Sequence, residues 1–342
     1  MRKLLAAAVL LVAGFTFAVT TLARSSENWD PALAARYLDA RQEAWFAWPR
    51  AASPDGPCIS CHTGLPYLLA RPALRKLLHE NAPTMYETGL RHRLDLRAGK
   101  EPVDGLQRTN TIFEAMFVTD ESKQRQAFEQ LWALQKTDGP LKGAWQWFAA
   151  DLDPWETPLQ VPYGAALGAL AIGSAPASIR ETPDAQARIR SLVEYLNSDL
   201  ANRPLHARIA MLWASTKLRQ VMDEHARTAT IDEILAKQQA DGGWTLESLG
   251  PWTDHPAAPP SLTPGASHPY ATALTAYVLK LAAGRRARTG TERALDWLRK
   301  HQDRRTGAWP AVSMNKKYPA GSMEEKFLQD AATAFAVLAL TS

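Results

Sequence analysis

The chain repeats one local layout, and this repetition limits the fold more than any other feature of the sequence. A helical stretch ends near a glutamine, a Gly-x-Trp turn follows, and after a loop comes an alanine-rich stretch. Three copies are "LQKTDGPLKGAW" before "PYGAALGALAIG", "KQQADGGW" before "PYATALTAYVL", and "HQDRRTGAW" before "DAATAFAVLAL". A fourth copy has "WFAWP" at 45–49 and "PYLLARPAL" at 66–74. Such recurrence indicates a fold built from similar supersecondary units.

The repeated units are predicted to be helical. Alternating Val, Ile and Thr runs are almost absent, whereas alanine and leucine recur at helical spacing. Completing the pattern predicts six helical pairs: 31–44 with 64–79, 84–97 with 106–119, 122–136 with 161–173, 184–199 with 203–217, 227–239 with 267–283, and 289–302 with 325–340. The second helix of a pair is generally the more apolar. We therefore expect an inner set of helices inside a more polar outer set.

The repeat marks resemble the QW motifs of squalene-hopene cyclases and the repeats of protein prenyltransferases. They are Gln135/Gly143/Trp145, Gln239/Gly242/Trp244 and Gln302/Gly307/Trp309. The resemblance covers residues 120–342 well and 30–119 weakly. It implies an all-α fold, an α6/α6 toroid, formed by residues 24–342 as one domain. Locally, we expect the glutamine to cap a helix end, the glycine to make the turn, and the tryptophan to pack between neighbouring hairpins.

The only two cysteines lie in Cys58-Ile59-Ser60-Cys61-His62, within the loop of the first hairpin. Two thiols at this spacing can form thioethers to the two vinyl groups of haem, and the adjacent imidazole can bind the iron. The motif therefore predicts one covalent haem c per chain, attached through Cys58 and Cys61, with His62 on the iron.

Other interpretations of the motif stay open. A thioredoxin-like redox pair needs a βαβ setting, which the sequence does not show, and a disulfide between Cys58 and Cys61 would close a tiny, strained loop. A zinc site would need more thiolates than the chain has. A free-standing cytochrome c over 25–120 would leave only four hairpins in an open arc. We favour one closed ring that includes the haem motif.

The N-terminus predicts export. Arg2 and Lys3 precede an uncharged run at 4–19, and Thr21-Leu22-Ala23 suits cleavage, so residues 1–23 are interpreted as a secretory signal peptide. An uncleaved membrane anchor is the alternative, although the run is short for a span of about 20 residues. A periplasmic location follows, and haem c is attached outside the cytoplasm.

Charge composition bears on partners. The chain has 39 Lys and Arg against 35 Asp and Glu, and loss of Arg2 and Lys3 with the signal peptide makes the balance more even. This argues against nucleic acid as a partner. Arginine clusters at 91–97 and 284–288 are interpreted as solvated faces, with membrane-surface contact as the alternative. The expected partners are a redox protein or a hydrophobic small molecule.

The activities of the resembled families find little support in the residues. Squalene-hopene cyclases protonate an alkene with an Asp-x-Asp-Asp motif, which this chain lacks. The nearest acids are Asp151, Asp153 and Glu156; they are the candidate catalytic residues, although loop capping is their more ordinary role. The zinc site of prenyltransferases needs a cysteine outside the haem motif, and there is none.

The leading hypothesis is an exported haem c redox protein on a cyclase-like toroid, acting in electron transfer or on a hydrophobic ligand. The alternatives are a terpenoid cyclase or transferase with a structural haem, and a scaffold that binds ligand or protein. The candidate distal iron ligands are His268 and then His255. We expect the haem loop 49–65 to share one end of the ring with loops 146–161, 245–268 and 310–330.

Overall fold

The computed structural model describes residues 29–253 and 265–342, and this part of the chain is helical. It contains thirteen α-helices and no β-strand, so the predicted all-α class is confirmed. The predicted signal peptide, residues 1–23, lies outside the described residues. No helix within the described residues is long and apolar enough to cross a membrane.

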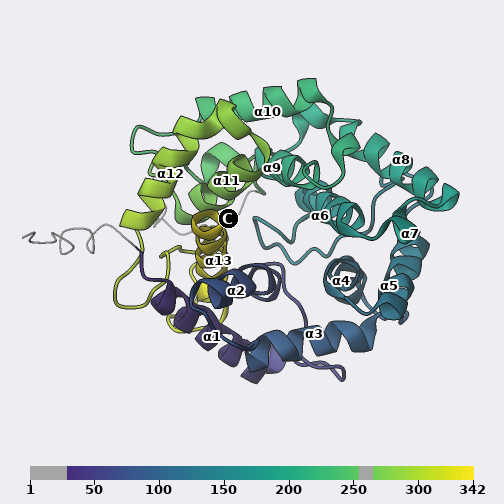
Figure 1. Cartoon of the computed structure of the whole chain (residues 1–342), viewed down its shortest axis with the longest axis horizontal. Coiled ribbons are helices and arrows are strands. Elements are labelled where there is room, and N and C mark those ends of the chain that lie inside the picture. The colour runs from purple at the N-terminus through teal and green to yellow at the C-terminus, as the bar shows by residue number, and fades with distance from the viewer. Residues whose placement is uncertain (1–28, 254–264) are drawn as a thin grey trace, which may run out of the picture.

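The long helices form an outer and an inner set, as Figure 1 shows. The outer helices are α1 Pro31–Ala47, α3 Met85–Arg97, α5 Glu121–Leu134, α8 Pro183–Asn197, α10 Glu224–Ala236 and α12 Arg288–Lys300. The inner helices are α2 Gly64–Leu77, α4 Gly105–Phe117, α6 Val161–Ser174, α9 Leu205–Ala214, α11 Pro269–Ala282 and α13 Phe327–Thr341. The short α7, Ala177–Arg180, precedes α8. All six predicted helix pairs are present, and their ends differ from the predicted ones by a few residues.

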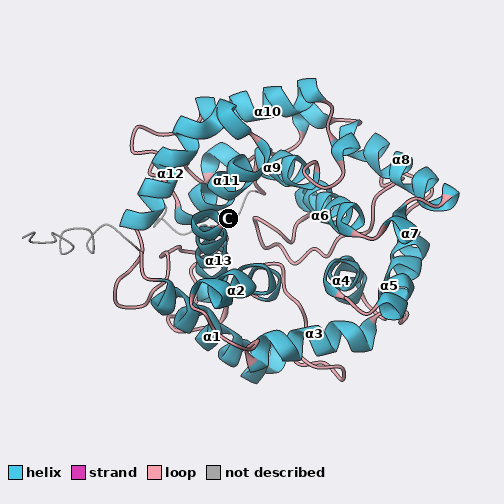
Figure 2. Ribbon diagram, viewed as in Figure 1, coloured by secondary structure: helices cyan, strands magenta, loops and turns pink. Residues whose placement is uncertain are grey.

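Local sequence explains why the two sets differ. Most outer helices begin after a residue whose side-chain oxygen accepts a hydrogen bond from the first turn: Asp30, Thr84, Asp120, Thr182 and Asp223. Inner helices such as α6 and α13 are instead buried on nearly every side. A helix packed between outer neighbours and other inner helices has no face exposed to solvent, so most of its residues are apolar. The long connections run between the two sets (Figure 2).

The repeated tryptophans and glycines join adjacent outer helices. Each indole Nε1 donates to a carbonyl in the last turn of the preceding outer helix: Trp145 to Leu131, Trp244 to Ile234 and Trp309 to Leu298, at 2.8, 2.7 and 2.8 Å. Each glycine has positive φ, and a Cβ there would meet the backbone of the next outer helix: Gly143 at Ser191, Gly242 at Arg293 and Gly307 at Leu33. Only glycine satisfies both conditions at once.

A glutamine side chain completes each of these connections between adjacent outer helices, which we call Gln–Gly–Trp joints. Gln135 Nε2 donates to the carbonyls of Gly143 and Arg188, at 2.8 and 3.0 Å. In the second copy Gln238 does this, bonding Gly242 and Gly290 at 2.8 and 2.7 Å, whereas the Gln239 amide donates to Lys237. Our assignment of Gln239 was therefore wrong by one residue, because two glutamines are adjacent and only Gln238 faces α12.

The third joint connects the two ends of the described chain. The Gln302 amide donates to the carbonyls of Gly307 and Asp30, both at 2.9 Å, and its oxygen accepts from Asp30 N at 2.6 Å. Because Asp30 caps α1, this glutamine binds the last outer helix to the first. Helix α13 also packs on α1 and α2, which closes the circuit of helices seen in Figure 1.

The loop between α5 and α6 extends into the middle of the molecule. Its Trp155 is fully buried, and the indole Nε1 donates to the hydroxyl of Tyr270 on α11 at 3.0 Å. Trp147, in the same loop, packs edge-on against Tyr163 of α6. The interior enclosed by the inner helices is therefore occupied by aromatic side chains from this loop, and it adjoins the cysteine motif.

Candidate functional site

The Cys-x-x-Cys-His loop is buried just before α2 and is held by α4. The Asn110 side chain pairs with both backbone groups of Ile59: Oδ1 accepts from its N–H at 3.2 Å, and Nδ2 donates to its carbonyl at 3.0 Å. Arg93 Nη1 donates to the same Asn110 oxygen at 3.1 Å. The backbone of Ile59, one of the two residues between the cysteines, is thus fixed to α4.

His62 sits among aromatic rings. Its imidazole stacks on Phe327 of α13 with ring centroids 3.6 Å apart. The ring of Trp45 lies edge-on to it at 5.4 Å, and that of Trp155 is tilted at 5.8 Å. Burial lowers the pKa of His62 well below its usual value. The ring is therefore neutral near pH 7, which is the form that binds a metal.

A polar chain fixes the tautomer of His62. Its Nδ1 lies 2.9 Å from the hydroxyl of Thr63, and that hydroxyl donates to Asp330 at 2.9 Å. Because the hydroxyl proton goes to Asp330, the oxygen must accept from Nδ1–H. Nε2 then keeps its lone pair. Asp330 also accepts from Tyr37 and Arg41, at 2.7 and 2.8 Å, so the acceptor end of the chain is itself fixed.

The two cysteines are free, buried thiols. Burial raises the pKa of Cys58 to about 11. Burial and the adjacent Glu156, to which its thiol is hydrogen-bonded, also raise the pKa of Cys61 well above its usual value. Burial also raises the pKa of Glu156 to about 7. All three groups are therefore largely protonated at mildly acidic pH.

Cys58, His62 and Glu156 line one cavity of about 280 Å³. Aromatic side chains form much of its wall: Trp45, Trp48, Phe148, Tyr318 and Phe327. Arg50 and Lys316 lie at its exposed rim. Its lining comes from the first-hairpin loop, the loop before α6 and the segment before α13, three of the four loops predicted to meet. The fourth reaches them through Thr253 N, which donates to Asp153 at 2.9 Å.

The residues of this cavity fit a covalently attached haem. Cys58 and His62 face the same space, and His62 offers Nε2 while its other nitrogen is held by a hydrogen-bonded partner, as is usual for metal-binding histidines. The Cys61 thiol is directed to Glu156, so thioether formation there requires it to leave that carboxyl. Among the described residues there is no group of three or more His, Cys, Asp or Glu that could hold a bare metal ion.

The three candidate acids have different surroundings. Asp151 is exposed and has positive φ. Asp153 is buried and accepts from Thr157 Oγ1 and from the backbone of residue 253, at 3.2 and 2.9 Å, which is the loop-stabilising role named above as the ordinary one. Only Glu156 lines the cavity. The structure therefore brings one of the three next to the cysteine motif.

Of the two candidate distal ligands, the structure describes only His268, and it does not line this cavity. His268 lines a different cavity, and its Nδ1 accepts from Tyr270 N at 3.2 Å. That hydrogen bond places the ring proton on Nε2. Binding of iron through Nε2 would move the proton to Nδ1 and would therefore break the hydrogen bond from Tyr270 N. His255 lies outside the described residues. Distal ligation by either histidine stays a prediction.

Sequence reasoning missed the residues that support the motif. Asn110 and Asp330 lie on helices predicted to be apolar and inner. A polar residue on such a helix indicates a buried hydrogen-bond partner, and this was the signal in the sequence that could have identified them. His206 was also missed: it is fully buried, with Nδ1 2.9 Å from Gln160 Oε1 and Nε2 2.8 Å from the hydroxyl of Tyr270. No sequence spacing connects these partners, which come from separate hairpins.

No known family model matches the chain, and a search of the curated proteins finds no match. The function is therefore inferred from the chemistry of the cavity.

Proposed function

We propose that the protein is an exported haem c redox protein built on an α/α-toroid. The observation that carries this proposal is His62: within a Cys-x-x-Cys-His motif, it lines a cavity with Nε2 free while Thr63 and Asp330 hold Nδ1. The three Gln–Gly–Trp joints and the two sets of helices support the toroid assignment.

The residues of the motif and of the cavity rim have defined parts in this proposal. Cys58 and Cys61 would supply the thioethers, and His62 would bind the iron through Nε2. Lys316 at the rim would pair with a propionate, whereas Arg50 is paired with Glu324 and would first have to leave that carboxylate. Bound haem supplies one-electron chemistry, and the aromatic walls lower the local polarity, which influences its potential. The partner is a redox protein or a hydrophobic small molecule outside the cytoplasm.

Attachment is tested by producing the chain with its own N-terminus in cells that have a haem c maturation system. We expect the intact mass to increase by one haem, and the reduced protein to show a haem c spectrum. Cys58→Ser and Cys61→Ser should each remove one thioether, and the double variant should carry no covalent haem. Arg108→Ala, outside the cavity, is the control. An unmodified mass despite active maturation would refute the proposal.

One observation favours a second function in the same cavity. Glu156 is buried there with a pKa of about 7, so it can donate a proton near neutral pH. This suits the acid of a terpenoid-type enzyme with a structural haem. The test is turnover of a polyprenyl substrate without any electron acceptor, in wild type, Glu156→Gln and the exposed control Asp151→Asn. Activity lost only in Glu156→Gln would support the second function over the first.

A further inference from the structure

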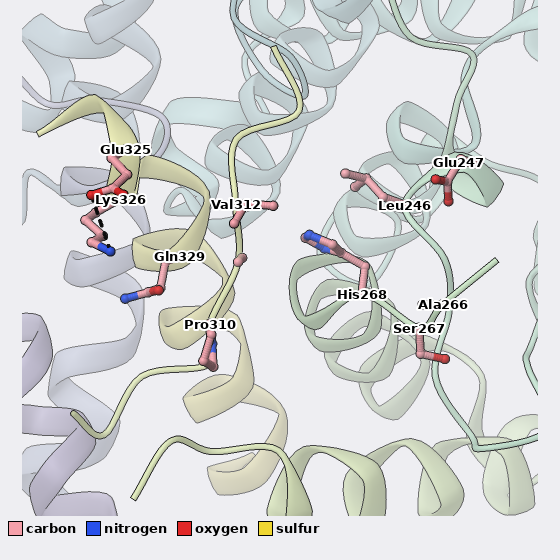
Figure 3. A pocket seen from close by; sticks show the side chains of 11 residues that line it. Leu246, Glu247, Ala266, Ser267, His268, Pro310, Val312, Glu325, Lys326 and Gln329 are labelled. Atoms are coloured by element: carbon pink, nitrogen blue, oxygen red, sulfur yellow. Dashed lines mark ion pairs between the residues drawn. The ribbon is translucent and has the colours of Figure 1, made fainter. Parts of the chain in front are cut away.

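A second cavity, of about 460 Å³, lies between the N-terminal ends of α11 and α13. Its apolar lining consists of Leu246, Pro310, Ala311 and Val312. Figure 3 shows His268 from the start of α11 directed into the space, opposite Val312 and Gln329. The volume is within the range of about 300–1,000 Å³ typical of small-molecule sites.

His268 is held in one orientation by backbone bonds. Its N–H donates to the carbonyl of Trp244 at 2.7 Å, its carbonyl accepts from Thr272 N at 2.9 Å, and its Nδ1 accepts from Tyr270 N at 3.2 Å. The neutral ring therefore carries its proton on Nε2. That nitrogen is buried and has no hydrogen-bond partner among the described residues. A buried donor without a partner is costly, and a ligand acceptor would satisfy it.

The charges around the cavity indicate a neutral ligand. Glu247 and Glu325 line it, and Lys326, whose ammonium lies 3.5 Å from the Glu325 carboxylate, is the one cation among the described lining residues. Because Nδ1 of His268 accepts a hydrogen bond from Tyr270 N, the ring is neutral and adds no positive charge. An anion would meet one uncompensated carboxylate and a neutral donor. A carbonyl oxygen on an apolar body meets the donor and the apolar lining.

We propose that this cavity binds a quinone, with one carbonyl oxygen accepting a hydrogen bond from His268 Nε2–H and the ring against Val312 and Pro310. The 3-10 helix Glu324–Lys326 and the start of α13 separate this site from the cysteine motif: Glu324 and Phe327 line the motif cavity, whereas Glu325 and Lys326 line this one. The role of the quinone as electron partner rests on the proposed haem function, whereas its binding does not.

The matched probes are duroquinone and durene, two flat six-membered carbon rings with four methyl groups at the same positions; durene has C–H groups where duroquinone has its two carbonyl groups. Duroquinone has no free ring position for thiol addition. Binding is followed in the full-length exported protein with nitrogen-15-labelled histidine, through the Nε2–H resonance of His268. We expect duroquinone to shift this resonance in a saturable way, and durene to bind at least tenfold more weakly.

Two variants separate binding from helix capping. His268→Ser keeps an oxygen that can cap α11 but removes the Nε2 donor, and should weaken duroquinone binding about tenfold without lowering the melting temperature. Val312→Trp should block the cavity. His301→Ser is the control, because that ring stacks on Trp297 elsewhere. Equal binding of durene, or unchanged affinity in His268→Ser, would overturn the proposal.

The Cys58→Ser/Cys61→Ser double variant keeps the two proposals distinguishable. Because it cannot hold covalent haem, duroquinone binding by this variant supports the quinone site whatever the outcome of the haem experiment. Haem attachment in the wild type without any duroquinone binding leaves the haem proposal intact and refutes this one.

Discussion

At His62, the hydroxyl of Thr63 accepts from Nδ1 because it donates to Asp330, and this leaves the lone pair on Nε2. At His268 a backbone N–H occupies Nδ1 and leaves the proton on Nε2. The two rings are both buried and both neutral near pH 7, yet one offers an acceptor or metal ligand and the other offers a donor. One neighbouring hydrogen bond decides the difference.

The tautomer of His62 should depend on Thr63. Thr63→Val keeps the shape of the side chain but removes the hydroxyl, so the Nδ1–H tautomer is no longer fixed. Nitrogen-15 chemical shifts of His62 in the haem-free protein should show one tautomer in wild type and in the control Thr63→Ser, and a mixture in Thr63→Val. Identical shifts in all three proteins would contradict the polar chain described above.

Two buried carboxyl groups should make stability depend on pH. Burial raises the pKa of Glu114 and of Glu156 to about 7, and neither oxygen of Glu114 has a partner among the described residues. Between pH 4.5 and 7 the unfolded chain loses these protons first, so the contribution of each group to the free energy of unfolding falls as pH rises. The fall should approach about 3 kcal/mol for each group.

Substitution isolates this contribution from that of the buried histidines, which titrate in a similar range. Glu114→Gln and Glu156→Gln should each gain stability relative to wild type as the pH is raised from 5 to 8, measured by urea unfolding. The surface variant Glu129→Gln serves as the control. Parallel curves for wild type and both buried variants would show that the carboxyl groups are not protonated in the folded state.

At the scale of elements, the Gln–Gly–Trp joints explain much of what the sequence could predict. The tryptophans and glycines recur because each joint needs a donor to the preceding helix and a backbone without Cβ against the next one. The starts of most outer helices also carry a local signal, because an Asp or Thr side chain caps the first turn. Gln238 was misassigned because its role depends on which of two adjacent side chains faces α12, and helical spacing alone does not determine that.

Close approach, rather than backbone conformation alone, should set the cost of changing these glycines. Gly307 and Gly321 have similar φ values of 83° and 78°. A Cβ at Gly307 would lie 2.3 Å from the backbone of Leu33, whereas one at Gly321 meets no atom within 4 Å. Gly321→Ala should cost about 1 kcal/mol of unfolding free energy, and Gly307→Ala several times more. Equal losses in chemical denaturation would argue against the joint.

Substitution of the tryptophans at the three joints should also lower the free energy of unfolding. Trp145→Ala, Trp244→Ala and Trp309→Ala each remove a buried indole and leave a helix-end carbonyl without its donor, so each should cost about 3–5 kcal/mol. Trp252, which is half-buried, provides a control with a smaller expected loss. Urea unfolding of the four variants gives the comparison, and losses below about 1 kcal/mol at the three joints would contradict it.

At the scale of the molecule, the cysteine motif is completed by residues from the far end of the chain. Phe327 and Asp330 of α13 contact His62 and Thr63 of the first hairpin. The sequence predicted that these loops share one end of the ring, but not which side chains meet. Contacts between residues so distant in sequence depend on how all six hairpins are placed relative to one another, and the local sequence pattern of one hairpin does not determine that placement.

Closure of the circuit should be measurable at Gln302. Gln302→Ala removes the bonds to Asp30 and to its own turn, and should lower the free energy of unfolding by about 1–3 kcal/mol. Gln239→Ala, which removes an amide bonded only locally, is the matched control. Limited proteolysis should release no stable fragment ending near residue 120; a compact N-terminal fragment would favour a separate cytochrome domain.

The position of α13 over the first hairpin also sets an order of events in time. Folded, the Cys58 and Cys61 side chains are 7% and 3% exposed, and a second protein could not reach them. The covering helix follows the motif in the chain, so it is made after the motif. Any enzyme that attaches a group to these thiols therefore works in the interval after the motif has been made and before α13 docks on it. Slowing that docking would lengthen the interval, and refolding the finished chain first would abolish it.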